Sequence, residues 1–128
     1  MWKAIKYDNR YLDEMLQMTV EQYGSENDIA DRNFLMHEYF ANPVGDAVIS
    51  LAWDDTKMQI AGQYIMWPMR FMVGNNKIKC AHSLNILTGK QYRGQGIFTG
   101  LAEENYKTAY KDDIAFTYAT PNPNSYPG

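Results

Sequence analysis

The sequence predicts an α/β domain built on one mixed sheet, and three observations carry this prediction. Apolar residues alternate in the middle of the chain, where Asp54-Asp55-Thr56 and Gly74-Asn75-Asn76 supply turn signals between successive strands. Apolar residues recur instead at helical spacing in the N-terminal third and after residue 97. The order strand, helix, strand over residues 78–119 requires a crossover, which places the last two strands parallel.

The N-terminal third predicts a short strand over residues 2–7 and two helices. Asp8 or Asn9 caps the first helix, which extends to about residue 23. The second begins near Asp28 or Asp31 and ends at Asn42-Pro43, because the residue before a proline avoids the helical region. The residues expected to face the core are Leu12, Met15, Leu16, Thr19 and Tyr23 in the first helix and Phe34, Leu35, Met36, Tyr39 and Phe40 in the second.

The central strands are predicted over residues 47–53, from residue 58 onward and over residues 78–88, followed by a helix over 97–111 and a fifth strand over 114–119. Pro68 interrupts the second of these strands. Because proline cannot donate to a sheet ladder, it indicates a bulge, a bend or an edge position. In the strand from residue 78, strict alternation places two sets of residues on opposite faces. These sets are Cys80, His82, Leu84 and Ile86, and Lys79, Ala81, Ser83, Asn85 and Leu87; a β-bulge would switch the alternation.

The segment Gln91–Phe98 joins two closely spaced glycines and an arginine to the start of the helix at residue 97. Unpaired backbone N–H groups at a helix start point outward and suit a phosphate or pyrophosphate. A tight turn that requires positive φ is the alternative explanation for Gly94 and Gly96. The sequence contains no Gly-Lys-Ser/Thr, and Gly100 falls one residue late for the dinucleotide pattern. The ordinary P-loop and the dinucleotide fingerprint therefore do not fit.

Length and composition indicate a single domain over residues 1–128 with a substantial core. The sequence has no apolar run of 18 residues and begins without the apolar segment of a signal peptide, so we expect a cytoplasmic protein with no membrane association. Cys80 is the single cysteine, and no Cys/His cluster has metal-ligand spacing, so neither an intramolecular disulfide nor a metal is expected.

The net charge of −3 gives no support for nucleic-acid binding, but the charge is unevenly distributed. Residues 8–55 contain eleven acidic residues and two basic ones, Arg10 and Arg32, whereas residues 57–93 contain six basic residues and no acid. One interpretation of the basic segment is solvated loops and strand edges, where lysines discourage edge-to-edge pairing of sheets. The alternative interpretation of the basic segment is attraction for a phosphorylated cofactor.

Two motifs in this chain are similar to motifs of the GNAT superfamily of acyl-CoA-dependent N-acyltransferases. Gln91-x-x-Gly94-x-Gly96 matches the superfamily signature Gln/Arg-x-x-Gly-x-Gly/Ala, and Thr120-Pro-Asn-Pro-Asn-Ser125 follows it at the spacing seen in many bacterial members. The resemblance covers about residues 78–125. It implies a GNAT-like mixed sheet, with strands 1–4 antiparallel, strands 4 and 5 parallel, and helices on both faces.

The resemblance also implies a site for acetyl-CoA. Backbone groups of Ile86, Leu87 and Thr88 would contact the pantetheine arm, and Asn122 and Ser125 would contact it after the fifth strand. The pyrophosphate would lie on the glycine turn, contacted by Gln91, Tyr92, Arg93, Gly94, Gln95, Gly96, Ile97 and Phe98. The implied reaction is acetyl transfer to a primary amine on a small molecule. A polar turn and a C-terminal loop are the simpler explanations of the same residues.

Direct transfer to an amine needs a base and groups that orient the reactants. His82 has a suitable intrinsic pKa, and Asn85 could position substrate or water; a packed core histidine is the competing interpretation. Cys80 is expected to be a buried, inert thiol. Glu38, Asp54 and Asp55 are more remote groups that could attract a cationic amine.

One departure from the superfamily pattern concerns the C-terminal part. The resemblance implies a further helix, which often bears a tyrosine that acts as general acid, and two further strands after the asparagine motif. We therefore expect a GNAT-like domain whose C-terminal part is missing and whose fifth strand has an exposed edge, which a partner chain in a homodimer could cover. The alternative functions are a catalytically silent acyl-CoA-binding or regulatory module and a partner-binding module.

Overall fold

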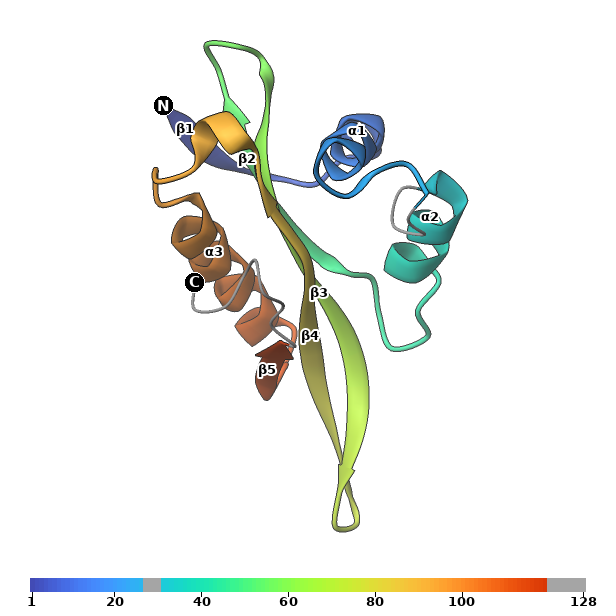
Figure 1. The fold of residues 1–128 in the computed structure, drawn as a ribbon. Helices are drawn as coiled ribbons and strands as arrows, with labels where there is room; N and C mark the ends of the chain where they lie inside the picture. The colour runs from blue at the N-terminus through green and yellow to red at the C-terminus, as the bar shows by residue number, and fades with distance from the viewer. Residues whose placement is uncertain (27–30, 120–128) are drawn as a thin grey trace.

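The structure is a computed structural model that describes residues 1–26 and 31–119. Within these two ranges, five strands form one sheet in the order β1-β2-β3-β4-β5. Helices α1 and α2 cover one face of this sheet and α3 covers the other (Figure 1). The elements are β1 (Trp2–Lys6), the short 3-10 helix η1 (Asn9–Tyr11), α1 (Leu12–Tyr23), α2 (Arg32–Phe40), β2 (Val48–Asp54), β3 (Gln59–Val73), β4 (Asn76–Thr88), η3 (Lys90–Tyr92), α3 (Ile97–Lys111) and β5 (Phe116–Ala119).

The strand directions agree with the sequence prediction. Strands β1 to β4 are antiparallel to their neighbours, and β4 pairs with β5 in parallel from Cys80↔Phe116 to Ser83↔Ala119. The crossover between them is α3, whose bounds are those predicted. The fold is therefore a mixed α/β sheet, as the sequence analysis predicted.

Pro68 lies inside β3, which continues through it for 15 residues. It pairs with Ala81 of β4, but β2 has already ended, since the last β2 pair is Val48↔Met66. Among the described residues, no strand lies beside Pro68 on the β2 side that would need a backbone N–H donor from position 68. The edge position is thus the correct one of the three possibilities that proline allowed.

Two hydrophobic clusters fill the two sides of the sheet. The α3 side contains Val48, Ala52, Tyr64, Met66, Ala81 and Leu101, and the α1/α2 side contains Met15, Leu35, Tyr39, Leu51 and Ile65. Most residues of the predicted helix stripes are buried or half-buried, but Phe34 and Tyr23 are 44% and 37% exposed. Each helix therefore uses a narrower apolar stripe than its composition suggested.

A β-bulge in β4 corrects the predicted faces of Asn85 and Ile86. Gln63 pairs with Leu87 and Ile65 pairs with Leu84, so two residues along β3 match three along β4. Asn85 has a φ of 50°, in the left-handed region that asparagine tolerates better than most residues. As a result, Ile86 packs against the α3-side cluster, whereas Leu84 packs on the α1/α2 side. Strict alternation was wrong beyond Leu84.

Candidate functional site

The glycine turn, defined here as residues Gly89–Gly96, connects β4 to the N-terminus of α3. Gly94 and Gly96 have φ values of 82° and 75°, and Gly96 is the left-handed N-cap of α3. A Cβ at either position would meet no atom within 4 Å. Backbone conformation therefore explains the glycines, and the same open space lets a ligand approach the N–H groups at the helix start.

The residues of the glycine turn divide into exposed and buried sets. Arg93, Gly94, Gln95 and Gly96 are exposed, as is Gln91. Tyr92 is 6% exposed and Ile97 is 2% exposed, and both side chains belong to the core cluster under α3. Their side chains are therefore not available to a bound phosphate, and only their backbone groups could contribute.

Hydrogen bonds to β1, β2 and β3 hold the glycine turn against the sheet. Gly89 N donates to Ala61 O at 2.8 Å, and the Tyr92 hydroxyl donates to Asp54 Oδ2 at 2.6 Å. Trp2 Nε1 of β1 donates to Gln95 O at 3.1 Å. A Cβ on Gly100 would lie only 2.4 Å from the nearest atom of the Trp2 ring. Gly100 is therefore required for packing rather than for phosphate binding.

Asp54 is a buried carboxylate, 5% exposed, at the end of β2. Its Oδ1 accepts from the backbone N–H groups of Thr56 and Lys57 at 2.9 and 3.3 Å. The hydrogen bond from Tyr92 lowers the pKa of this carboxyl; burial opposes the shift, and the two backbone donors add to it. Asp54, one of the three acids considered for attracting an amine, therefore has both carboxylate oxygens hydrogen-bonded within the fold.

The pKa of Asp54 predicts a specific pH dependence of stability. Because the folded-state pKa is lowered, the stabilisation is complete above the ordinary aspartate pKa and is lost as the pH falls through the folded-state value. The difference in melting temperature between wild type and Asp54→Asn should be constant from pH 8 to about pH 5 and shrink below about pH 4. Calorimetric melting at a series of pH values measures it; a difference that grows with acidity would contradict the assignment.

Strand β4 extends beyond the last described pair with β5. Pairing ends at Ser83↔Ala119, and β4 continues to Thr88. Leu87 is buried, whereas Ile86 and Thr88 are half-buried. These three residues, which the resemblance assigned to the pantetheine arm, thus lie between the end of the described β4/β5 pairing and the glycine turn. Asn122 and Ser125, assigned to the same arm, lie outside the described residues.

His82 lies at the penultimate described pair of β4 and β5. Its ring stacks on Tyr118, with centroids 4.7 Å apart and planes 6° from parallel, and it is half-buried opposite Trp67. Cys80 is fully buried, and burial raises the pKa of its thiol. The thiol is therefore buried, as predicted, whereas the His82 side chain keeps partial solvent exposure at the pair before the last described one.

Asn85 and its neighbours form a polar cluster on the α2 side of the bulge. Asn85 Nδ2 donates to the Tyr39 hydroxyl at 2.8 Å, and Gln63 Nε2 donates to Asn85 O at 2.7 Å. Gln63 Oε1 is buried and has no hydrogen-bond partner among the described residues. Burial raises the pKa of the Tyr39 hydroxyl, the bond from Asn85 lowers it in part, and the Glu38 carboxylate raises it further.

Glu38 is the predicted remote acid that keeps an available carboxylate. It is half-buried, burial raises its pKa, and it makes no ion pair with any described residue. Asp55 instead pairs with Lys3 at 3.1 Å at the surface. Since the Trp67 indole donates to Glu38 O at 2.7 Å, α2 is fixed to β3 at this residue.

The basic segment of residues 57–93 does not form one surface. Arg70, Lys77 and Lys79 lie on the β3/β4 hairpin, and Lys79 is nine residues from Thr88, roughly 30 Å along an extended strand. Lys90 and Arg93 lie in the glycine turn itself, and Lys57 lies 5.9 Å from the centre of the Tyr92 ring. Only these last three basic residues could contribute to phosphate attraction.

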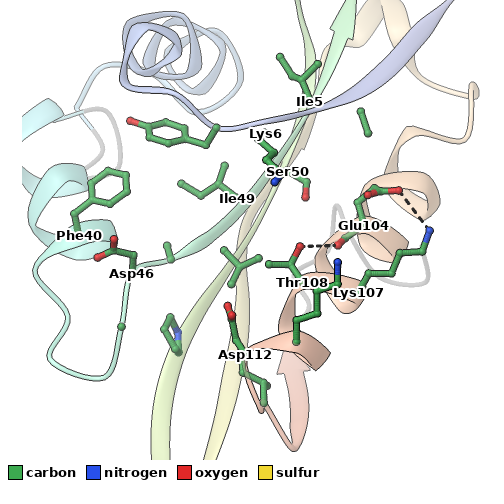
Figure 2. Close-up of a pocket in the computed structure, with 18 of the residues that line it drawn as sticks. Ile5, Lys6, Phe40, Asp46, Ile49, Ser50, Glu104, Lys107, Thr108 and Asp112 are labelled. Atoms are coloured by element: carbon green, nitrogen blue, oxygen red, sulfur yellow. Dashed lines mark hydrogen bonds and ion pairs between the residues drawn. The ribbon is translucent and has the colours of Figure 1, made fainter.

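A cavity of about 870 Å³ lies away from the glycine turn. Figure 2 shows it between the start of β2 and the C-terminal half of α3, with Ser50, Glu104, Lys107 and Asp112 around it. Lys107 pairs with Glu104 at 3.6 Å, so part of its charge is internally compensated. None of the predicted site residues that the structure describes lines it. A smaller cleft of about 390 Å³ lies between α1 and the glycine turn and includes Gln59 and Gln91.

Sequence reasoning missed the supports of the glycine turn. Trp2 and Gln95 are 93 residues apart, and Asp54 and Tyr92 are 38 apart, so no local pattern links either pair.

Among the described residues, no helix has the length and apolar character needed to cross a membrane.

Solved structures share this fold at low sequence identity. A predicted acetyltransferase with acetyl-CoA from Clostridium acetobutylicum matches with a TM-score of 0.78 and 18% identity, covering 99% of this chain and 85% of that one. Glucosamine-6-phosphate N-acetyltransferase from Arabidopsis thaliana matches at 0.75 and 12%, over 97% and 84%. A probable N-acyltransferase from Enterococcus faecalis matches at 0.77 and 16%, over 94% of this chain and 29% of that longer one.

Sequence comparison identifies the family. No curated protein matches this chain. The family model described as the acetyltransferase (GNAT) domain matches residues 4–127, which is nearly the whole chain. With the mixed sheet, the parallel β4/β5 pair and the left-handed glycine at the start of α3, this match shows that the chain belongs to the GNAT acetyltransferase family.

Proposed function

We propose that this protein is an N-acetyltransferase that moves an acetyl group from acetyl-CoA directly to a primary amine of a small molecule. The observation that carries the proposal is the glycine turn, whose exposed Arg93–Gly96 segment leads into the N-terminus of α3 with open space around Gly94 and Gly96. Backbone N–H groups at a helix start, together with a guanidinium, suit a pyrophosphate.

The described residues fit the cofactor in two regions. The pyrophosphate would lie against Gln91–Phe98, with Tyr92 and Ile97 contributing backbone groups alone because their side chains are buried. The pantetheine arm would follow Ile86, Leu87 and Thr88, and Asn122 and Ser125 are further proposed contacts from the family resemblance. Charge-assisted hydrogen bonds of this kind contribute about 1.5–3 kcal/mol each.

When bound, acetyl-CoA supplies a thioester that a neutral amine attacks. We assign the proton-accepting role to His82, because its imidazole is half-buried rather than enclosed and lies on β4 beside β5, opposite Tyr118. Asn85 would orient the reactants from the bulge, where its carbonyl and side chain are already held by Gln63 and Tyr39. These hydrogen bonds provide the rigidity that positioning requires.

The acceptor class follows from charge. Glu38 offers a half-buried carboxylate next to Tyr39, whose hydroxyl accepts a hydrogen bond from Asn85. A carboxylate attracts a substrate amine in its protonated, ammonium form. An amino sugar, a polyamine or an amino acid fits this requirement. The structural similarity to glucosamine-6-phosphate N-acetyltransferase is consistent with an amino sugar.

Replacing His82 by phenylalanine tests the catalytic assignment. The new ring can keep the stacking on Tyr118 while it removes the proton acceptor. The assay measures the release of CoA from acetyl-CoA in the presence of each amine of a panel. At neutral pH, kcat should fall by a factor of roughly 10²–10⁴, and the affinity for acetyl-CoA should be retained. His37→Phe, at an exposed histidine of α2, is the matched control and should keep wild-type turnover. An unchanged rate for His82→Phe would remove His82 from the mechanism.

One observation favours a second candidate function, a catalytically silent acyl-CoA-binding or regulatory module. The His82 face is stacked on Tyr118, and the Asn85 amide already donates to Tyr39, so both catalytic candidates have structural roles. Acetyl-CoA binding without CoA release for any amine in the panel would favour this module over the enzyme.

A further inference from the structure

The conformation of the glycine turn depends on contacts from outside it. Among the described residues of this segment, Tyr92 alone has a buried side chain, and Arg93, Gly94 and Gln95 lie between η3 and α3 with exposed side chains or none. The backbone N–H groups of the glycine turn can converge on a ligand only if residues outside the turn hold its backbone in place. The question is therefore which residue outside the turn sets its position.

The hydroxyl of Tyr92 both donates and accepts a hydrogen bond, and its partners are the last residue of β2 and the first residue of β3. It donates to Asp54 Oδ2 at 2.6 Å and accepts from Gln59 Nε2 at 2.7 Å. Asp54 is itself held, because Oδ1 accepts from the backbone N–H groups of Thr56 and Lys57. These two backbone hydrogen bonds fix the orientation of the carboxylate that accepts from Tyr92.

The hydrogen bond between Asp54 and Tyr92 is stronger than the one that Trp2 makes with the turn. The Asp54–Tyr92 bond is buried and has an ionised acceptor, which makes such a bond roughly twice as strong as a neutral one. The bond from Trp2 to Gln95 O is neutral and exposed, where water competes for both groups. Asp54 therefore limits the movement of the turn more than Trp2 does.

We propose that Asp54 and Gln59 are positioning residues that act through the Tyr92 hydroxyl to hold the glycine turn in its ligand-binding conformation. Neither residue would touch the ligand or the reacting atoms. The inference rests on the proposed function for the identity of that ligand, the pyrophosphate of acetyl-CoA. The hold on the turn itself is a property of the free protein and can be measured without cofactor.

Tyr92→Phe tests the proposal, because it removes the hydroxyl and keeps the ring in the core cluster. Amide hydrogen exchange of residues 90–96 in the free protein should become about tenfold faster, with residues 101–111 of α3 unchanged. The dissociation constant for acetyl-CoA, measured by titration calorimetry, should rise about tenfold, equivalent to about 1.4 kcal/mol. In turnover assays KM for acetyl-CoA should rise while kcat at saturation is retained. Tyr110→Phe, at a tyrosine that is 83% exposed, is the matched control and should change none of these.

Gln59→Met provides a second variant if Tyr92→Phe folds poorly, since it removes the other hydrogen-bond partner of the hydroxyl at a half-buried position. Unchanged exchange of residues 90–96 in the folded variants would overturn the proposal, whether or not the protein binds acetyl-CoA. Faster exchange with unchanged affinity would overturn the claim that the held conformation is the binding one. Failure of the wild type to bind acetyl-CoA would refute the proposed function, and the exchange data would still decide whether Asp54 and Gln59 hold the turn.

Discussion

Gly96→Asp should abolish measurable binding of acetyl-CoA without unfolding the protein. Gly96 has a φ of 75° and caps α3, and aspartate tolerates this left-handed conformation better than most residues. The space around it is open, so the side chain meets no protein atom within 4 Å of its Cβ. It would instead place a negative charge where the pyrophosphate is proposed to lie, adding repulsion to steric exclusion. Titration calorimetry measures the loss of affinity.

Gly74→Asp is the matched control for this change. Gly74 also has a positive φ, 62°, and open space around it, but it lies in the β3/β4 hairpin away from the glycine turn. The two variants carry the same charge change and comparable backbone strain. Acetyl-CoA affinity should therefore be lost in Gly96→Asp and kept in Gly74→Asp; equal affinity in both folded variants would contradict the phosphate assignment.

Asn105→Leu should cause the largest loss of stability, roughly 3 kcal/mol. Asn105 of α3 is fully buried. Its Nδ2 donates to Val48 O at 3.1 Å and to Tyr64 O at 3.0 Å, and its Oδ1 accepts from the Ser50 hydroxyl. Leucine is similar in size but makes none of these bonds, so Ser50 would lose its partner. Thermal unfolding should show a melting temperature lower by roughly 10 °C for a chain of this length.

Two further variants separate this network from a general effect of leucine in the helix. Glu103→Leu changes an exposed neighbour on α3 and should leave the melting temperature within a few degrees. Ser50→Ala combined with Asn105→Leu should be less destabilised than the sum of the single changes, because the unpaired hydroxyl is gone. If Asn105→Leu were as stable as Glu103→Leu, the buried network would not anchor α3 to the sheet.

Sequence pattern predicted the elements whose signals are local. The bounds of α3 followed from helical spacing between Ile97 and Lys111, and the parallel β4/β5 pair followed from the crossover rule. The predicted faces of β4 failed at Asn85, because a bulge adds a residue and no local pattern in β4 marks it. Pro68 left three possibilities open, and the length of β2, a non-local fact, decided between them.

The left-handed conformation of the glycine turn was predictable from the sequence, but the contacts that support the turn were not. Gly94 and Gly96 were identifiable because left-handed conformation selects glycine. Asn105 could have been found, since it lies four residues from both Leu101 and Ala109 on the buried face of α3. Trp2 and Asp54 could not, because their contacts with the glycine turn depend on the order of strands in the folded sheet.

The most direct test of the phosphate assignment is a calorimetric comparison of two ligands on the wild-type protein. Acetyl-CoA carries the pyrophosphate, and S-acetylpantetheine has the same thioester and arm but lacks the pyrophosphate together with the 3′-phosphoadenosine. We predict micromolar binding of acetyl-CoA and affinity at least about a hundredfold weaker for S-acetylpantetheine, a difference of about 2.7 kcal/mol. Equal affinity for the two ligands, or no binding of acetyl-CoA, would contradict the assignment of the glycine turn as the phosphate site.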